Sequence, residues 1–235
     1  MREVRLLLRM RKSKEKKFVH LVAHSNPKSP IAEQYRLIRN NLYFASIDKE
    51  ITSIVVTSPQ PFDGKSTTSA NLAIVLSQQG KRVLLVDADL RKPTVHYTFK
   101  VSNIDGLTSV LAREIDLNQA IIKTYVPNLD LLTSGPIPPN PSELLGSTSM
   151  ELVLKELKEM YDYVILDTPP LLAVSDSQIL ANKCDGAILV VSSGKTKRDQ
   201  AMKSKQLLEM ATTQLLGVVV NGVNEKQNNY YGRYG

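Results

Sequence analysis

The sequence predicts an α/β domain with a mostly parallel sheet flanked by helices. Six short runs of apolar and β-branched residues alternate along the chain with stretches of helical pattern. The runs are almost continuously apolar, which is typical of parallel strands buried on both faces. A Gly-Lys-Ser sequence lies between the first run and the helix that follows it, the usual place of a phosphate-binding loop.

The elements follow one another in a regular order. The predicted strands occupy 51–57, 82–87, 129–132, 163–167, 187–191 and 215–220. Helices are expected at 31–46, 66–79, 108–112, 117–122, 149–161, 175–182 and 198–212. Strands that alternate with helices indicate successive βαβ units in one sheet. We therefore divide the chain into a basic N-terminal arm (1–28), one folded domain (29–223) and a flexible tyrosine-rich tail (224–235).

The net charge of +7 is concentrated in the arm. Residues 1–17 contain eight basic and two acidic residues, which gives +6 and leaves the rest of the chain at +1. A nearly neutral body argues against nucleic acid as a partner. The arm also has five apolar residues among residues 4–10, so it suits the anionic inner leaflet of a membrane or a partner's juxtamembrane segment. A solvated, disordered arm is the alternative.

The location expected from these features is the cytoplasm, with peripheral attachment at the inner face of the plasma membrane. A single cysteine, Cys184, suits a reducing compartment. No apolar run approaches the ~18 residues that cross a bilayer, so we do not expect this chain to span a membrane by itself. His20, His24 and His96 have no metal-ligand spacing, and no zinc site is predicted.

The phosphate-binding loop is predicted to hold ATP through its last residues, Asp63, Gly64, Lys65, Ser66 and Thr67. In such a loop the backbone N–H groups face the phosphates, the lysine reaches the β and γ oxygens, and the serine hydroxyl is a ligand of Mg²⁺. ATP and Mg²⁺ are thus the expected cofactors.

Two positions of this loop depart from the general pattern. Pro59 stands where a glycine is usual, and Phe62 stands where a small residue would let the backbone approach the phosphates. A bulky residue is restricted if that position requires a positive φ. We expect Phe62 to slow turnover more than it weakens nucleotide binding.

Three aspartates stand at the ends of two other predicted strands. Asp87 and Asp89 follow the second strand and Asp167 ends a later one. The carboxyl ends of parallel strands share one edge of the sheet, so these acids should lie beside Lys65. Asp167 is expected to hold Mg²⁺ through water, and of Asp87 and Asp89 one can face the metal and the other an incoming hydroxyl. Helix capping or solvated turns are the alternative roles for such acids.

Residues 87–93 resemble the second Walker motif of the bacterial tyrosine kinases (BY-kinases), the cytoplasmic autokinases of capsule and exopolysaccharide export. The resemblance extends from about Ser29 to the C-terminus and includes residues 132–141, 167–170 and the tyrosine-rich end. It implies a P-loop NTPase fold of the partition-ATPase-like branch. It also implies that Asp87 is the base that accepts the proton of a tyrosine hydroxyl, while Asp89 and Asp167 order Mg²⁺ with Ser66.

The same resemblance assigns roles to both ends of the chain. Tyr230, Tyr231 and Tyr234 would be the phosphoacceptors, although an inert sticky tail is the alternative. From residue 224 to 235 an extended chain reaches at most ~36 Å, enough for phosphorylation in trans on a neighbouring subunit. In the family the Glu-x-x-Arg-x-x-Arg pattern lies at the interface of a closed ring, which favours that role over a solvated helix face. The residues of this pattern are Glu33, Arg36 and Arg39.

The implied partners are other copies of the chain and a separate transmembrane activator. A cognate tyrosine phosphatase and further protein substrates are also implied, within regulation of capsule or exopolysaccharide synthesis and export. Asn221 follows the last strand, and resemblance to related P-loop ATPases would place it at the adenine edge. A strand-end turn residue is its equal alternative.

Two other classes of function remain as alternatives. One is a partition- or division-type switch ATPase that binds membrane or DNA. Gln60 argues against it because those proteins carry an extra lysine there, and the terminal tyrosines also argue against it. The other is a nucleotide-binding adaptor with weak activity, which Phe62 keeps open.

Overall fold

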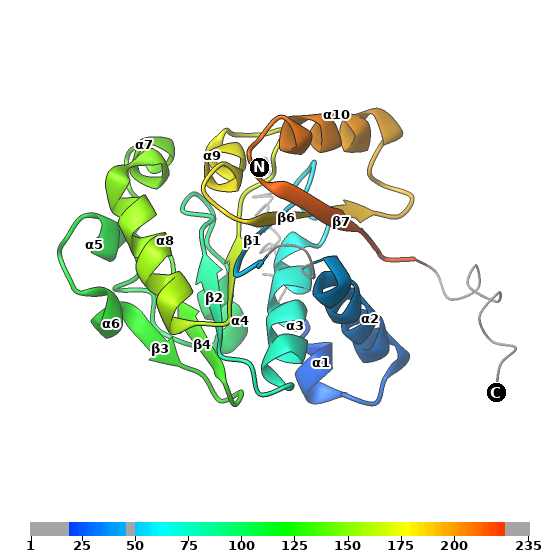
Figure 1. Cartoon of the computed structure of the whole chain (residues 1–235), viewed down its shortest axis with the longest axis horizontal. Coiled ribbons are helices and arrows are strands. Elements are labelled where there is room, and N and C mark those ends of the chain that lie inside the picture. Colours follow the sequence, from blue (N-terminus) through cyan, green and yellow to red (C-terminus); the bar gives the residue numbers. More distant parts are fainter. Residues whose placement is uncertain (1–18, 46–49, 224–235) are drawn as a thin grey trace, which may run out of the picture.

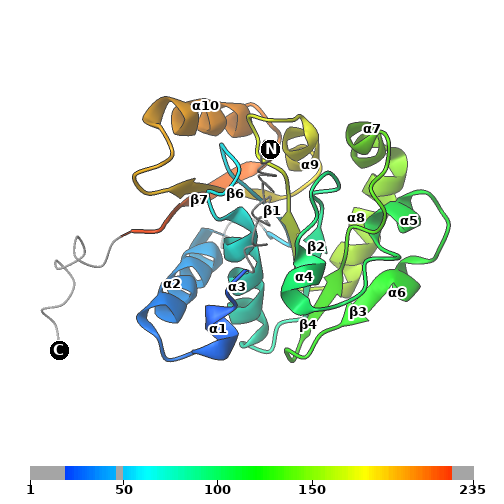
Figure 2. The same ribbon diagram turned by 180° about the vertical axis from the view of Figure 1, so that it is seen from behind.

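The computed structural model describes residues 19–45 and 50–223 (Figures 1 and 2). They form one sheet whose strands are β1 (Ser53–Thr57), β2 (Val83–Asp87), β3 (Ile121–Lys123), β4 (Leu129–Leu132), β5 (Tyr163–Asp167), β6 (Gly186–Ser192) and β7 (Gln214–Asn221). The order across the sheet is β3-β4-β2-β5-β1-β6-β7. All neighbouring strands run parallel except β3, which is antiparallel to β4 at one edge.

Helices cover both faces of the sheet. One face carries α1 (Val22–Ser25), α2 (Pro30–Ala45), α3 (Lys65–Ser77) and α4 (Val95–Phe99). The other carries α5 (Leu107–Leu111), α6 (Leu117–Ala120), α7 (Pro141–Gly146), α8 (Thr148–Met160), α9 (Asp176–Ala181) and α10 (Arg198–Glu209). The predicted fold class is therefore confirmed.

Alternation along the strands explains why the sheet is buried on both sides. In β2, Leu84 and Val86 pack with the α5–α10 layer, whereas Val83 and Leu85 pack with the α1–α4 layer. All four side chains are fully buried. Because complete burial of a Leu or Val side chain contributes ~1.5–3 kcal/mol, both layers hold the strand firmly. The strand ends, where the acidic residues lie, are consequently fixed in space.

Local sequence signals explain where two of the helices begin. Pro141 occupies the first turn of α7, where its missing N–H has no helical partner to lose. Ser147 caps α8, and its hydroxyl oxygen accepts a hydrogen bond from the N–H of Met150 at 3.3 Å. These two helices follow β4 and lead the chain back to β5.

One predicted helix is shorter than expected. The helix expected at 117–122 ends at Ala120, and the next three residues form β3 instead. Ile121 and Ile122 pair with Leu132 and Leu131 of β4, because β-branched side chains fit a pleated edge better than the end of a four-residue helix. The short helices α1, α4 and α7 were not predicted, whereas α5 and α6, which are equally short, were. Segments of 4–6 residues carry little periodicity, so such helices are detected unreliably.

The folded domain also begins earlier than predicted. The Ala23 side chain in α1 is fully buried, and the Ala23 N–H donates to Oδ1 of the buried Asn71 in α3 at 2.9 Å. Asn71 in turn donates to the carbonyl of His20 at 2.8 Å. The expected boundary between residues 28 and 29 is therefore too late in the chain. The arm up to residue 18 and the tail from residue 224 lie outside the described residues.

Candidate active site

The phosphate-binding loop joins β1 to α3, and its geometry requires a glycine at its end. Gly64 precedes α3 with φ +100°, a left-handed conformation that side chains rarely adopt. A Cβ at this position would lie 2.0 Å from Nδ2 of Asn221. The N-terminus of the 13-residue α3, with its free N–H groups and positive dipole end, thus opens onto the loop.

Phe62 occupies the loop in a way that the sequence only partly predicts. Its φ is 70°, so the position does require the left-handed conformation that disfavours a bulky residue. Phe62 is nevertheless 87% exposed, so its side chain lies largely in solvent. Phe62 therefore strains the backbone without filling the space in front of α3.

Asp63 and Asn221 brace the loop from within. The Asp63 carboxylate accepts hydrogen bonds from the Gln60 N–H and from the Thr196 hydroxyl, each at 2.9 Å. Asn221, the last residue of β7, donates from Nδ2 to the Asp63 carbonyl at 3.1 Å. These contacts show both side chains holding the loop, and an adenine contact by Asn221 stays a prediction. Thr196, in the turn after β6, was missed because threonine in a turn gives no signal in the sequence.

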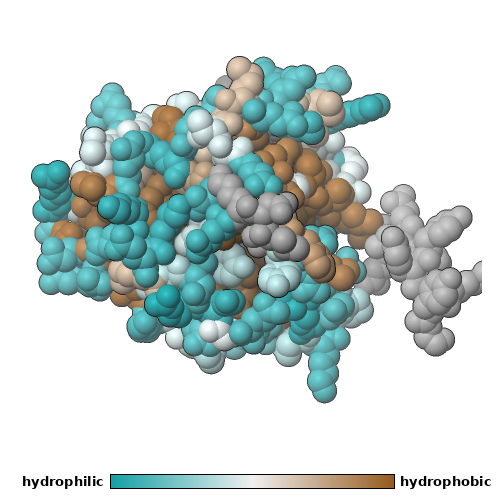
Figure 3. Space-filling view, viewed as in Figure 1, coloured by the Kyte–Doolittle hydropathy of each residue, from teal (hydrophilic) through white to brown (hydrophobic). Residues whose placement is uncertain are grey.

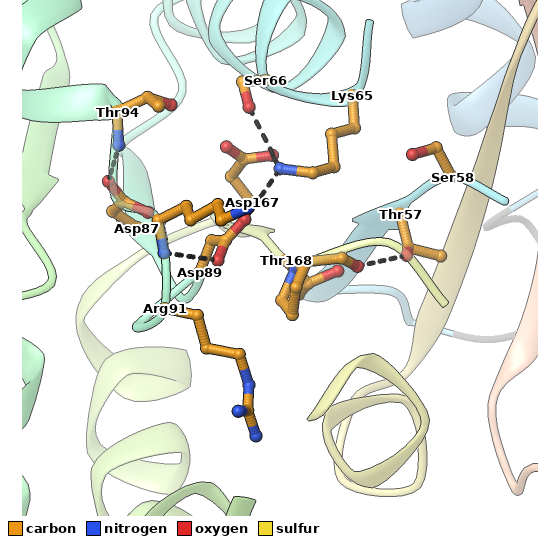
Figure 4. Close-up of polar contacts among 12 residues, drawn as sticks. Thr57, Ser58, Lys65, Ser66, Asp87, Asp89, Arg91, Thr94, Asp167 and Thr168 are labelled. Atoms are coloured by element: carbon orange, nitrogen blue, oxygen red, sulfur yellow. Dashed lines mark hydrogen bonds and ion pairs between the residues drawn. The ribbon is translucent and has the colours of Figure 1, made fainter. Parts of the chain in front are cut away.

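The three predicted aspartates meet around Lys65 (Figure 4). Asp87 and Asp167 face each other in register at the ends of β2 and β5. The Lys65 Nζ lies 3.2 Å from Asp89 Oδ2 and 3.9 Å from Asp167 Oδ1, and it also donates to the Ser66 hydroxyl at 3.3 Å. The structure thus brings together the acids and the lysine that the sequence predicted at this edge.

Asp87 is held by the next helix. Its Oδ2 accepts hydrogen bonds from the N–H groups of Thr94 and Val95, at 3.0 and 2.9 Å, where α4 begins. Its Oδ1 is buried and has no hydrogen-bond partner. Burial, together with the negative charge of Asp167, raises the pKa of Asp87 to about 8. One oxygen is therefore fixed by backbone N–H groups, and the unpartnered Oδ1 is the position where this carboxyl group binds its proton.

Charge pairing keeps Lys65 protonated. Burial disfavours its charge, but attraction to Asp167 and Asp89 outweighs burial and raises the pKa of Lys65. Burial also raises the pKa of Asp167, against the attraction of Lys65. Ser69, one helical turn beyond Lys65, donates to Asp167 Oδ1 at 3.2 Å. This residue was missed, although its i+4 spacing from Lys65 placed it on the same helix face.

The residues present fit a bound Mg²⁺ and nucleotide. Asp87 Oδ1 and Asp167 Oδ2 are buried oxygens without partners, which is costly unless a cation or proton donor comes to them. Within the described residues, no cluster of three or more His, Cys, Asp and Glu forms a complete metal cage. Mg²⁺ does not need one, since it is usually held by one or two carboxylates, waters and substrate phosphates.

The remaining predicted residues lie outside this cluster. Thr67 stands in the first turn of α3, where its carbonyl accepts a hydrogen bond from Asn71 at 2.9 Å. Glu33, Arg36 and Arg39 lie on α2, away from the acids. The tail tyrosines Tyr230, Tyr231 and Tyr234 lie beyond the described residues.

Comparison with known proteins places this geometry in a family. A family model described as an AAA domain matches residues 52–211, well over half of the chain. Tyrosine-protein kinase YwqD of Bacillus subtilis is 52% identical over 216 residues, covering 92% of this chain and 91% of that protein. The chain belongs to the bacterial tyrosine-protein kinases. Tyrosine-protein kinase CpsD of Streptococcus agalactiae is 40% identical over 206 residues, covering 86% of this chain and 89% of that one.

Solved structures agree with this family. The kinase domain of Escherichia coli tyrosine kinase ETK matches with a TM-score of 0.84 at 36% identity, over 90% of this chain and 83% of that one. The chimerical protein CapA2B2 matches with a TM-score of 0.83 at 45% identity, over 87% and 90% of the two chains. The expected family and kinase function are confirmed over the switch-ATPase alternative.

The predicted branch of the P-loop fold is confirmed as well. The septum site-determining protein MinD of Pyrococcus horikoshii, solved with Mg-ADP, matches with a TM-score of 0.63 at 27% identity, over 72% of this chain and 69% of that one. This lower score fits a shared fold. The likeness supports a site that binds a nucleotide with Mg²⁺.

Proposed function

We propose that this tyrosine kinase transfers the γ-phosphoryl group of ATP to the tyrosines of its own C-terminal tail. The observation that carries this proposal is the buried Asp87, whose unpartnered oxygen lies in the acidic cluster beside Lys65. A buried carboxylate with a raised pKa at a phosphate-binding loop is suited to accept a proton during catalysis.

Lys65 and the backbone N–H groups of the loop hold and orient the phosphates in this proposal. Ser66, Asp89 and Asp167 are the residues that would hold Mg²⁺. When bound, Mg²⁺ neutralises charge that develops on the phosphate oxygens. Lys65 pairs with Asp89 and Asp167 in this structure, and with Mg²⁺ bound its Nζ would be free to bind the phosphate oxygens instead.

Asp87 is the general base in its ionised form, which the positive charge of a bound Mg²⁺ would favour at neutral pH, because a nearby cation lowers the pKa of a carboxyl group. A tyrosine hydroxyl has a pKa near ~10, so its proton must move as the new bond forms. The tyrosine oxygen bonds to the γ-phosphorus, the bond to the ADP oxygen breaks, and the proton passes to Asp87 Oδ1. Asp87 Oδ2 stays fixed by the N–H groups at the start of α4.

Direct detection of phosphotyrosine after incubation with Mg-ATP tests this proposal. Lys65→Met and Asp87→Asn should each abolish tail phosphotyrosine, measured by mass spectrometry, while circular dichroism stays unchanged. Asp162→Asn, in a partly exposed ion pair with Arg82, is the matched control. Phosphate release without labelled tyrosine would indicate a switch ATPase, and persistent labelling of either variant would overturn the assigned roles.

Phosphorylation of the tail is proposed to occur in trans. The tail follows β7, an edge strand whose carboxyl end lies on the same side of the sheet as the acidic cluster. A mixing experiment tests whether transfer occurs between subunits. Lys65→Met protein with an intact tail is mixed with active protein in which Tyr230, Tyr231 and Tyr234 are replaced by Phe. Labelled Lys65→Met chains are expected, and their absence would favour transfer within one subunit.

A ring of identical subunits is proposed to form through α2. Within one chain Arg36 pairs with Glu33 at 2.7 Å, and Arg39 donates to the Val75 carbonyl at 3.2 Å. The exposed surface of the helix is partly apolar, with Ile31, Leu37, Tyr43 and Phe44 all more than a third exposed. Figure 3 also shows apolar side chains gathered over the neighbouring β7, where Val218 and Val220 are exposed.

Light scattering can test the ring. Arg36→Glu combined with Arg39→Glu should reduce the particle to a smaller species, because the new negative charges would repel acidic residues of the neighbouring subunit that the arginines attract in the proposed ring. Arg82→Glu with Arg198→Glu makes the same change of charge on other elements and should leave the size unaltered. Equal particle mass for all three proteins would contradict an interface on α2.

Peripheral attachment to the inner face of the plasma membrane is proposed for the basic arm. No helix among residues 19–45 and 50–223 is long and apolar enough to cross a bilayer. Deletion of residues 1–17 should lower sedimentation with anionic vesicles without changing ATP affinity. A protein that sediments equally well after the deletion would refute this role of the arm.

Regulation of capsule or exopolysaccharide synthesis, with a separate transmembrane activator and a cognate phosphatase, completes the proposal. The similarity to a chimerical protein, CapA2B2, supports a kinase that works with a second chain. Replacing the gene with its Lys65→Met form should alter the amount or length of the surface polymer. An unchanged amount and length of the polymer in that strain would contradict a role of this kinase in polymer synthesis or export.

A further inference from the structure

Arg91 follows the acidic segment after β2 and turns away from it. It stands two residues beyond Asp89, and Figure 4 shows its guanidinium pointing away from the three carboxylates. Its main partner, Asp176, is the first residue of α9, which follows β5 and its terminal Asp167, and a second partner, Ser142, lies in α7. The side chain therefore spans from one acid-bearing loop to the other.

The contacts of Arg91 form a closed network. Its Nε donates to Asp176 Oδ2 at 2.8 Å and its Nη2 to Asp176 Oδ1 at 3.0 Å, so the guanidinium holds both carboxylate oxygens. Nη2 also donates to the Ser142 hydroxyl at 2.9 Å, and that hydroxyl donates to Asp176 Oδ1 at 2.7 Å. The geometry is that of a bidentate pair, which fixes orientation as well as distance.

Burial makes this network rigid. The Asp176 side chain is completely buried and the Arg91 side chain is 38% exposed. Burial disfavours the charge of Asp176, but hydrogen bonds from Arg91 and Ser142 outweigh it and lower the pKa of Asp176. A buried carboxylate is tolerated only while it remains paired, so the two residues cannot separate easily.

The network connects directly to the acids of the site. The N–H of Lys92, next to Arg91, donates to Asp89 Oδ1 at 3.0 Å, so the backbone that Arg91 anchors also orients Asp89. Beside it, the N–H of Ala88 donates to the carbonyl of Asp167 at 2.8 Å. Asp89 and Asp167 thus lie on two loops that are joined near the acids by the backbone and farther out by the Arg91 fork.

We propose that Arg91 and Asp176 are positioning residues that set Asp89 against Asp167 at the separation Mg²⁺ requires. In this proposal they act on the acids through the two loops and not by direct contact with the reacting groups. The inference rests on the proposed assignment of Mg²⁺ to these acids. Partners of this kind behind metal ligands typically change metal affinity by ~10–100-fold when they are removed.

The test measures how much Mg²⁺ the full chain needs to bind a fluorescent ATP analogue. Arg91→Lys keeps the charge but loses the fork, and Asp176→Asn keeps the shape but loses the charge. Each should raise the Mg²⁺ concentration for half-maximal binding by about tenfold, while binding without Mg²⁺ stays unchanged. The matched controls are Arg82→Lys and Asp162→Asn, which come from a surface ion pair at 3.6 Å. They should leave the Mg²⁺ concentration for half-maximal binding unchanged.

The double variant tests whether the two residues act as a unit. If they do, Arg91→Lys with Asp176→Asn should need no more Mg²⁺ than the more affected single variant. Multiplied effects, or a lower melting temperature with an unchanged Mg²⁺ requirement, would overturn the proposal. If Asp176→Asn does not fold, Ser142→Ala replaces it. This change removes both hydrogen bonds of the Ser142 hydroxyl but leaves the Arg91–Asp176 pair, so it should raise the Mg²⁺ requirement by only ~2–3-fold. An unchanged requirement would again overturn the proposal.

The Mg²⁺ dependence of nucleotide binding by the wild-type protein distinguishes a failure of the positioning role from a failure of the proposed Mg²⁺ site. If its nucleotide binding does not respond to Mg²⁺, the assignment of the metal to the acids fails, and the positioning role fails with it. If the wild type responds and the variants respond identically, only the positioning role fails.

Discussion

Phe62 shows how one residue can strain a functional loop without blocking it. Its φ of 70° places a β-carbon where glycine is favoured, while the residue is 87% exposed. The left-handed conformation costs a residue with a β-carbon ~1–2 kcal/mol. Replacing Phe62 with glycine would remove this strain, but part of the benefit would be lost because glycine loses more backbone entropy on folding. The expected penalty therefore arises from the backbone and not from the aromatic ring.

Phe62→Gly should accordingly tighten nucleotide binding or speed tail phosphorylation by up to ~5-fold, the equivalent of ~1 kcal/mol. Phe62→Ala removes the ring but keeps the β-carbon, so it should behave like the wild type. Binding titrations and initial rates on the three proteins provide the measurement. If glycine changes neither quantity, the strain does not bear on function.

Asp87 is expected to lower the free energy of unfolding at neutral and higher pH. Its folded pKa of about 8 is above the ~3.9 of an unfolded aspartate. Between these values the folded protein binds more protons than the unfolded chain, so the contribution of Asp87 to stability is present at low pH and is lost as pH rises.

Asp87→Asn should therefore be more stable than the wild type in nucleotide-free protein with EDTA. The gap should widen from about pH 5 to about pH 8, with a melting temperature ~2–4 °C higher for each kcal/mol gained. Urea unfolding at several pH values measures it, and Asp162→Asn is the control. A gap that stays constant or narrows with rising pH would contradict the raised pKa.

The docking of α1 against α3 is the clearest packing feature at the level of elements. Asn71 is fully buried and bonds to the segment at two points, the N–H of Ala23 and the carbonyl of His20. Its amide also donates to the Thr67 carbonyl, in the first turn after the phosphate-binding loop. The N-terminal segment and the loop helix are thus held by one side chain.

Asn71→Ala should lower the free energy of unfolding by ~1–3 kcal/mol, because a buried N–H at Ala23 loses its partner. Limited proteolysis should also cut residues 19–28 faster. Asn118→Ala, at an exposed position of α6, is the control. Unaltered proteolysis of the segment would show that apolar packing of Ala23 alone holds α1.

Element prediction succeeded where long apolar runs carried the signal. The central strands were predicted nearly residue for residue, since both faces of each strand are buried and the run is continuous. β3 was missed because a three-residue edge strand is defined by its partner β4 and not by its own pattern. The same lack of local signal hid α1 and α4, although the first N–H group of α4 binds Asp87, the proposed base.

At the scale of the assembly, phosphorylation should loosen the ring. Each phosphotyrosine adds roughly −1.5 to −2 charges, so three would place about −5 on each tail. Like charges crowded on neighbouring tails repel, which disfavours the closed particle. Size measurement before and after phosphatase treatment tests this, with the triple Tyr→Phe tail as a control that stays assembled. An identical particle mass before and after treatment would refute the cycle.

The sequence alone determined the α/β class, the phosphate-binding loop and the cluster of Lys65 with its three aspartates. It could do so because these features depend on order along the chain, and the ends of parallel strands must share one edge of the sheet. Only the tertiary structure showed the α4 N–H groups on Asp87, the bracing of the loop by Asn221, and the Arg91 fork on Asp176. These contacts join residues up to 158 positions apart, and no local pattern encodes which distant side chain a fold will bring within hydrogen-bonding distance.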